Sequence, residues 1–156
     1  MTQFTPPAPA ADFILQAPPM RFIDEVLRAD ERGAATRTTV RADAIAADAS
    51  GRLPASALIE VMAQTIGVFA GAVELSRGES PKPGLLLGTR RMTLEQPSFA
   101  PGDVLLCEVE KTFESDEGLW QFSCTVTVLP QGRAAQSRPA GSAVLNVYNP
   151  PAGYFD

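Results

Sequence analysis

The sequence predicts an α+β domain in which a curved antiparallel sheet wraps around one long buried helix. Residues 55–75 form an apolar run that is too long for a strand and is typical of a helix. The run has no clean polar face, so such a helix must be buried on most sides. Extended segments rich in β-branched residues precede and follow it. A sheet that curls around the helix accounts for both observations.

Length and composition indicate one soluble globular domain. The chain has 156 residues, of which 45% are hydrophobic and 20% charged. We expect a flexible arm rich in Pro and Ala at residues 1–13, the folded domain at residues 14–150 and a tail at residues 151–156. The net charge of −5 disfavours a nucleic-acid partner, because an acidic surface repels phosphate.

The elements follow one another in an order that fits this fold. A hairpin is expected from residues 21–28 and 34–41, with Asp30–Gly33 as its turn. Pro54 suits the first turn of the helix, where its missing N–H is no loss, and Ser76–Gly78 ends the helix. After the helix, strands are predicted at Leu85–Leu94, Asp103–Phe113, Leu119–Leu129 and Ser142–Tyr148.

Polar residues and cysteines indicate a cytoplasmic protein. Glu60, Gln64 and Glu74 argue against a membrane-spanning helix, because each would be costly in lipid. Residues 1–12 do not have the pattern of a secretory signal. We therefore expect Cys107 and Cys124 to be reduced core residues. Because the chain has no histidine and only two, separated cysteines, we expect no zinc site. We expect no other cofactor.

Several motifs resemble those of 3-hydroxyacyl-carrier-protein dehydratases. Leu58–Gln64 reads Leu-Ile-Glu-Val-Met-Ala-Gln and is similar to the family's helix motif, with Pro54 at the place of its preceding proline. Further likenesses lie at Pro18–Met20, Phe22–Val26, Pro101–Asp103, Leu87–Arg91 and Leu145–Tyr148. The last two look closer still to a divergent branch, the dehydratase-like proteins of aryl polyene biosynthetic clusters. The resemblance covers residues 15–149.

This resemblance implies a hotdog fold and an acyl-thioester substrate carried by acyl carrier protein or coenzyme A, in fatty acid or polyene biosynthesis. It also implies a homodimer, or a heterodimer with another hotdog protein, because hotdog active sites form between two subunits. In the family, a histidine removes the proton beside the thioester carbonyl and a helix Glu or Asp protonates the departing hydroxyl.

Only half of that catalytic pair is present in this sequence. Glu60 matches the family's acid and is the predicted catalytic residue. Ala46 stands where the catalytic histidine is expected, and Gln16 replaces the histidine of the N-terminal motif. Asp48 lies nearby, but a carboxylate is a weaker base than imidazole at neutral pH. The residues alone leave open a second interpretation of Glu60, as a solvated acid favoured by the helix dipole.

Six further residues are candidates for substrate binding: Gln64, Pro54, Ala55, Gln16, Arg90 and Arg91. Gln64 follows Glu60 by one helical turn on the same face. Arg90 and Arg91 either are surface residues or attract an acidic carrier protein and its phosphopantetheine arm. Gly67 and Gly71 continue the Glu60 face. Because glycine weakens a helix interior, they indicate close approach of the sheet or of a partner subunit, in preference to the alternative of an acyl tunnel.

Three functions fit the sequence. The chain is a dehydratase or isomerase with an unorthodox base, a thioesterase in which Glu60 activates water or attacks the thioester, or a non-catalytic subunit that binds acyl chains or completes a heterodimer. We favour a partnered or degenerate dehydratase. The purified homo-oligomer is then expected to have little or no dehydratase activity, because it lacks the base.

Overall fold

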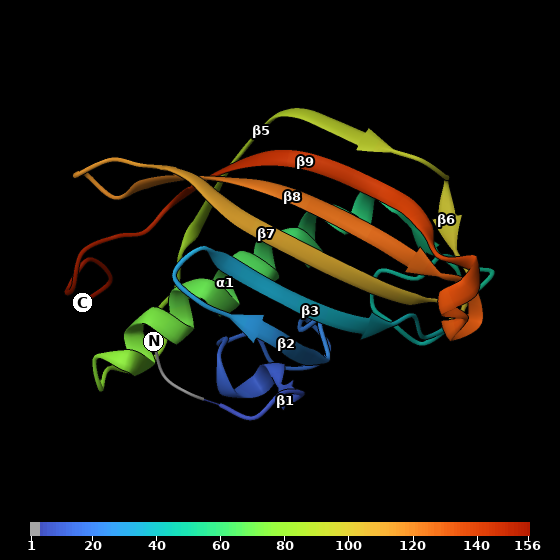
Figure 1. Cartoon of the computed structure of the whole chain (residues 1–156), viewed down its shortest axis with the longest axis horizontal. Helices are drawn as coiled ribbons and strands as arrows, with labels where there is room; N and C mark the ends of the chain where they lie inside the picture. The colour runs from blue at the N-terminus through green and yellow to red at the C-terminus, as the bar shows by residue number, and fades with distance from the viewer. Residues whose placement is uncertain (1–3) are drawn as a thin grey trace.

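A seven-stranded antiparallel sheet in the order β1-β2-β3-β7-β8-β9-β5 curves over helix α1 (Figure 1). The computed structural model describes residues 4–156. The strands of this sheet are β1 (Ala8–Pro9), β2 (Glu25–Ala29), β3 (Gly33–Thr39), β5 (Leu85–Leu94), β7 (Val104–Glu114), β8 (Leu119–Leu129) and β9 (Arg138–Tyr148). A second, two-stranded pair consists of β4 (Leu53–Pro54) and β6 (Ser98–Phe99). This is the hotdog arrangement that the resemblance implied.

Helix α1 (Leu58–Ser76) is the core of the domain, as predicted. It packs against β3, β7 and β8, and none of residues 58–75 is exposed. By length and hydropathy the segment Ala55–Ser76 is apolar enough to cross a membrane, but here its apolar side chains fill the space under the sheet. The start of the helix differs from the prediction: Pro54 belongs to β4, and a 3₁₀ turn at Ala55–Ala57 precedes the helix.

Strand β8 and the first half of β7 bury every second side chain against the helix, whereas β5 has no buried residue. Cys107 of β7 and Cys124 of β8 both point into this core and form no disulfide. Burial raises the pKa of the Cys107 thiol to about 12, so it stays protonated. Strand β9 begins four residues before the predicted Ser142. In the added stretch the pairing of β8 with β9 shifts register: Val126 pairs with Gly141 and Thr127 with Pro139, so that Ala140 of β9 is the extra residue of a bulge.

The N-terminal segment is packed more closely on the domain than the predicted arm at residues 1–13. Strand β1 pairs with β2, and the N–H of Ala10 donates to the carbonyl of Asp24 at 3.0 Å. Ala10 is fully buried and Phe13 is 4% exposed. The predicted arm therefore contacts the domain from Ala8 onward and also at Phe4, whose ring packs against that of Phe13, and residues 1–3 lie outside the described residues.

The same segment explains the helix glycines. A Cβ atom at Gly71 would lie 2.0 Å from the carbonyl oxygen of Phe13, and one at Gly67 would lie 3.3 Å from Cγ2 of Ile14. The close neighbour of this helix face is thus the N-terminal segment, whereas the sequence had indicated the sheet or a partner subunit. The sequence did not reveal this contact, because the N-terminal segment is short and rich in Pro and Ala and the contact depends on tertiary packing.

Candidate functional site

Glu60 lies in the first turn of α1 and is half-buried. Its carboxylate accepts a hydrogen bond from Nε2 of Gln64, one turn later, at 2.8 Å. Of the two carboxylate oxygens, Oε1 makes this bond and Oε2 makes none within the described residues. One oxygen is therefore fixed and the other is available to a ligand or a proton.

Gln64 holds Glu60 in a defined orientation. The Gln64 side chain is only 1% exposed, and its Oε1 accepts the N–H of Phe22 at 2.8 Å. Its Nε2 donates to the carbonyl of Met20 at 2.8 Å as well as to Glu60. Because the Phe22 N–H needs an acceptor, the amide must present its NH₂ group to Glu60. Gln64 thus links Glu60 to the chain segment before β2.

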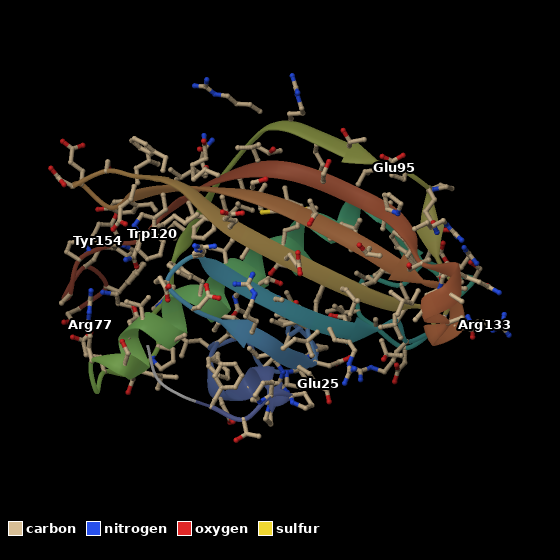
Figure 2. All side chains as sticks on the ribbon, viewed as in Figure 1. Glu25, Arg77, Glu95, Trp120, Arg133 and Tyr154 are labelled. Atoms are coloured by element: carbon tan, nitrogen blue, oxygen red, sulfur yellow. The ribbon has the colours of Figure 1, made fainter. Side chains whose placement is uncertain are left out.

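Glu60 lines a cavity of about 280 Å³, which we call the Glu60 cavity. Its walls come from the N-terminal segment, one face of α1, the loop after α1, the start of β5 and the ends of β8 and β9. The lining residues are Phe13–Gln16, Glu60, Ala63, Ile66, Gly67, Ala70, Pro81–Leu86, Trp120 and Val147–Asn149. Trp120 lies at the end of the sheet opposite Arg133 (Figure 2). Glu60 is the one carboxylic acid among these residues, and the other titratable side chains of the wall are those of Lys82 and Tyr148.

Two backbone N–H groups at the start of the helix already have hydrogen-bond acceptors. At the end of the 3₁₀ turn before α1, the N–H of Leu58 donates to the carbonyls of Ala55 and Ser56. The N–H of Ala55 donates to the carbonyl of Pro97 at 2.9 Å.

Ala46 lines a different cavity, which we call the Ala46 cavity and which also measures about 280 Å³. It lies among the segment before β2, the end of β3, the loop after β3 and the first turn of α1. The lining residues are Pro18, Pro19, Arg21, Phe22, Thr38–Arg41, Asp43–Ala46, Leu53 and Val61. Glu60 and the position of the missing histidine therefore do not share a cavity within one chain.

Asp48 does not replace the missing base. It is exposed, lines neither cavity, and accepts hydrogen bonds from the hydroxyl and N–H of Ser50 and from the N–H of Arg52. The Ser50 hydroxyl, followed by the Arg52 N–H, lowers the pKa of Asp48 below the usual Asp value. A carboxylate stabilised in its ionised form is a still weaker base.

The other predicted binding residues fall into three places. Gln16 lines the Glu60 cavity, and Gln64 lies behind Glu60 rather than in the cavity wall. Pro54 and Ala55 line a separate cavity with Leu94, Glu95, Gln96 and Pro97. Arg90 and Arg91 are exposed on β5 and line neither of the two cavities defined above. The structure thus brings Gln16, Gln64 and Glu60 together and leaves the other four apart.

Sequence reasoning did not identify Lys82, Trp120 and Tyr148 as walls of the Glu60 cavity. Trp120 alternates with other core residues along β8 and has no feature that would mark it as a site residue. Lys82 lies in a loop held by Glu74, whose Oε2 accepts the N–H of Lys82 at 2.9 Å. These contacts join distant parts of the chain, so no local motif reveals them.

The profile of the ApeP-like family, described as ApeP dehydratase, matches residues 8–155. The chain belongs to the ApeP-like dehydratase family. This agrees with the resemblance found in the motifs, and dehydratase-like function follows from it. No curated protein matches the chain.

Solved structures confirm the hotdog fold. The dehydratase heterocomplex ApeI:P from Xenorhabdus doucetiae matches at 24% identity over 93% of each chain, with a TM-score of 0.81. The hexameric thioesterase y2039 from Yersinia pestis matches at 20% identity over 74% of this chain and 85% of that one, with a TM-score of 0.53. A mutant of the phenylacetic acid degradation protein PaaI from Thermus thermophilus matches at 17% identity, over 80% of this chain and 90% of that one, with a TM-score of 0.57. At these identities the likeness concerns the fold.

Proposed function

We propose that this chain is the acid-bearing subunit of a two-chain dehydratase that acts on 3-hydroxyacyl thioesters, in fatty acid or polyene biosynthesis in the cytoplasm. The observation that carries the proposal is Glu60, oriented by a buried Gln64 and facing a cavity that holds no other carboxylic acid among the described residues. Because this chain contains no histidine, the imidazole base must come from a second, different hotdog protein.

The proposed reaction divides two proton transfers between two chains. The partner's imidazole removes the proton from the carbon beside the thioester carbonyl. The electron pair of that C–H bond forms the carbon–carbon double bond as the C–O bond to the hydroxyl breaks. Protonated Glu60 gives its proton to the departing hydroxyl, which leaves as water. The free Oε2 of Glu60 is the oxygen suited to carry that proton, since Oε1 is held by Gln64.

Strand β5 is the proposed contact with the partner. It lies at the end of the sheet, paired with β9 on one side and with no strand on the other among the described residues. The strand has four exposed leucines: Leu85, Leu86, Leu87 and Leu94. An unpaired apolar edge strand tends to pair with a strand of another chain, so this edge suits a partner. Leu85 and Leu86 also line the Glu60 cavity, so a strand added here would reach its rim. The ApeI:P structure is named as a heterocomplex, which supports a partner of a different sequence.

The proposed substrate is carried by acyl carrier protein or coenzyme A. Arg90 and Arg91 remain the proposed contacts for an acidic carrier or its phosphopantetheine arm, because both guanidinium groups are exposed and neither takes part in an ion pair within the described residues. Because both arginines lie on β5, the proposed carrier contacts would be close to the proposed subunit interface.

A reconstitution assay tests the proposal. The chain is mixed with a histidine-bearing hotdog protein, supplied with 3-hydroxyoctanoyl-carrier protein, and the enoyl product is measured by mass spectrometry. We expect negligible turnover by the chain alone, turnover by the mixture, and a loss of roughly 10²–10⁴ in rate for Glu60→Gln in the mixture. Glu110→Gln, the same change at an exposed position of β7, is the control and leaves the rate unchanged.

The products distinguish the alternatives. Release of the free acid in place of the enoyl thioester would identify a thioesterase. Robust dehydration by the isolated chain would contradict the need for a partner. Full activity of the mixture that contains the Glu60→Gln chain would indicate that the chain is only a binding or structural subunit.

A second test restores the missing base. Ala46→His places imidazole where the family keeps it, and we expect the variant chain alone to gain dehydratase activity over its parent. Because Ala46 and Glu60 line separate cavities in one chain, that activity must arise between two copies and must disappear when Glu60→Gln is added. A folded Ala46→His variant without any gain would show that residue 46 does not correspond to the family's catalytic position.

A further inference from the structure

The Glu60 cavity extends along one face of α1. Glu60, Ala63, Gly67 and Ala70 all belong to its wall, at spacings of three or four residues that keep them on one helix face. At a rise of 1.5 Å per residue, Ala70 lies about 15 Å beyond Glu60 along the helix. Many of the other wall residues are apolar, among them Phe13, Ile14, Leu15, Ile66, Leu85, Leu86 and Val147. The cavity is therefore elongated and largely apolar, which suits the hydrocarbon part of a ligand.

Trp120 lies at the end of this cavity that is far from Glu60. Its ring centroid is 5.5 Å from that of Phe69, about two and a half helical turns after Glu60. Figure 2 shows Trp120 at the same end of the molecule as Arg77, the residue that follows α1. Glu60, in contrast, lies in the first turn of α1. A chain that runs along the helix face from Glu60 therefore meets Trp120 at the far end.

The Trp120 ring is held in place by its neighbours. It packs edge-to-face on Phe69 and on Phe122, with ring centroids 5.5 Å and 6.1 Å apart. The Nζ atom of Lys111 lies 5.3 Å from the centroid of the Trp120 ring and 5.3 Å from that of Phe69. An ammonium group this close to an aromatic ring attracts it. Only 6% of Trp120 is exposed, so the ring is a fixed wall of the cavity.

Lys111 has an unusual position for a lysine. It is registered opposite Phe122 in the pairing of β7 with β8, so its side chain starts on the face of the sheet that covers the helix. Its stem lies against apolar side chains, and its ammonium group forms an ion pair with Glu114. The side chain of Lys111 is 24% exposed and that of Glu114 is 50% exposed. Lys111 thus connects the buried Trp120 ring to the surface at this end of the domain.

From this arrangement we propose that Trp120 limits the length of the acyl chain that the Glu60 cavity accepts, and that Lys111 positions the Trp120 ring. The inference rests on the proposed function only in taking an acyl thioester as the ligand. A chain that reaches the ring can extend no farther, because Phe69, Phe122 and Lys111 hold the ring in place. Trp120 is a specificity-determining residue and Lys111 a positioning residue, and neither transfers a proton.

A series of ligands that cannot react tests the length limit. 2-Oxoalkyl-CoA thioethers keep a carbonyl but have neither a thioester bond nor a 3-hydroxyl group, so the chain can neither hydrolyse nor dehydrate them. The full-length protein is titrated with analogues from the butanoyl to the hexadecanoyl equivalent, below the concentrations at which the longer ones form micelles. Calorimetry measures the affinity, and the emission of Trp120, the chain's single tryptophan, reports contact with the ring.

We expect affinity to depend on chain length in two stages. Each CH₂ group that enters the apolar cavity is expected to tighten binding roughly fourfold. Once the chain reaches Trp120, affinity stops rising, and the emission of Trp120 changes from that length onward. Glu60→Gln is expected to keep the same limit, so a failure of length selection is distinguishable from a failure of catalysis.

Matched variants test the role of the ring. Trp120→Leu stays apolar but removes the ring, and we expect affinity to continue rising for chains beyond the parent's limit. Phe113→Leu, a change at an exposed aromatic residue of β7, leaves the limit unchanged. If Trp120→Leu does not fold, Ala70→Leu fills the same cavity between Glu60 and Trp120 and is expected to move the limit to shorter chains.

The positioning role of Lys111 has its own variants. Lys111→Met keeps an apolar stem and removes the ammonium group, so the ring is held less firmly. We expect chains just beyond the parent's limit to bind roughly two- to fivefold more tightly to this variant than to the parent. Lys111→Arg is expected to restore the parent's limit, because a guanidinium group also stacks on aromatic rings. A purely structural role would change stability and leave the limit where it is.

The proposal would be overturned by any of three results. The first is one length limit shared by the parent chain, Trp120→Leu and Ala70→Leu. The second is a Trp120 emission that responds equally to all chain lengths. The third is the absence of binding of every analogue, both by the chain alone and by the mixture used in the reconstitution assay. The reconstitution assay itself measures turnover, so the proposed function is decided separately.

Discussion

Replacing Gly71 with alanine is a sharp test of how the N-terminal segment is packed. The segment carries Phe13, which is 4% exposed and lines the Glu60 cavity. The Cβ atom of Gly71→Ala would lie 2.0 Å from the backbone carbonyl oxygen of Phe13. A relaxed carbon–oxygen contact is about 3.3 Å, so the segment must move by roughly 1.3 Å.

The structure sets the size of the effect. Overpacking of this kind costs about 1–3 kcal/mol, and part of the buried area of Phe13 is lost when the segment moves. Alanine in a helix interior recovers about 1 kcal/mol relative to glycine. We therefore expect Gly71→Ala to lower the free energy of unfolding by about 1–2 kcal/mol.

Gly67→Ala is the matched control, one turn earlier on the same helix face. Its Cβ atom would lie 3.3 Å from Cγ2 of Ile14, a side-chain atom that can shift. The gain in helix propensity then dominates, and we expect stability that is unchanged or higher by up to about 1 kcal/mol. The two variants thus differ in sign although the chemical change is the same.

Urea unfolding followed by the fluorescence of Trp120, the chain's single tryptophan, measures both variants. Protein concentration is held constant, because oligomers unfold in a concentration-dependent way. With a slope near 2 kcal/mol/M, the Gly71→Ala midpoint is expected to fall by roughly 0.5–1 M. A midpoint equal to or above that of the parent, at an unchanged slope, would refute the packing of Phe13 against Gly71.

Two further predictions concern buried polar side chains. Gln64→Leu leaves the N–H of Phe22 and the carbonyl of Met20 without their hydrogen-bond partner. We therefore expect the free energy of unfolding, measured in urea, to fall by about 1–3 kcal/mol or more. An unchanged urea midpoint would contradict these hydrogen bonds. Burial raises the pKa of Glu74 in the folded state, so ionisation costs stability as pH rises through that pKa. Glu74→Gln, which can still accept the N–H of Lys82, is therefore expected to be more stable than the parent at pH 7 and equal to it below the ordinary Glu pKa. Thermal unfolding across that range measures the difference, and a Glu74→Gln variant less stable than the parent at pH 7 would contradict it.

The fold was predictable because its main signals are local. A helix apolar on nearly all sides must be enclosed, and alternating strands show which face encloses it. The N-terminal segment was not predictable in the same way. A stretch rich in Pro and Ala has no hydrophobic periodicity, and its packing depends on the absence of side chains at Gly67 and Gly71, which lie far away in the sequence. Pro54 fits both a helix start and an extended strand, and the pairing of β4 with β6 decided between them.

The only part of the site that could be predicted is the part determined by helix geometry. Glu60 and Gln64 stand four residues apart, which places them on one face of any helix, and their hydrogen bond follows from that spacing. The cavity around Glu60 was not visible in the sequence, because Lys82, Trp120 and Tyr148 reach it from three separate elements. Arg90 and Arg91 were chosen for their charge alone, and charge does not specify where an edge strand presents its side chains.

The separation of Glu60 from Ala46 within one chain has a consequence for the proposed complex. In a pair of identical subunits related by twofold symmetry, each interface site would contain Glu60 of one copy and residue 46 of the other. Both sites would then have an acid and no base. With a histidine-bearing partner, one site combines Glu60 with the partner's imidazole, and the second combines the partner's acid with Ala46. The proposed heterodimer would therefore convert substrate at one site, and its second site would keep a cavity but no base to remove a proton.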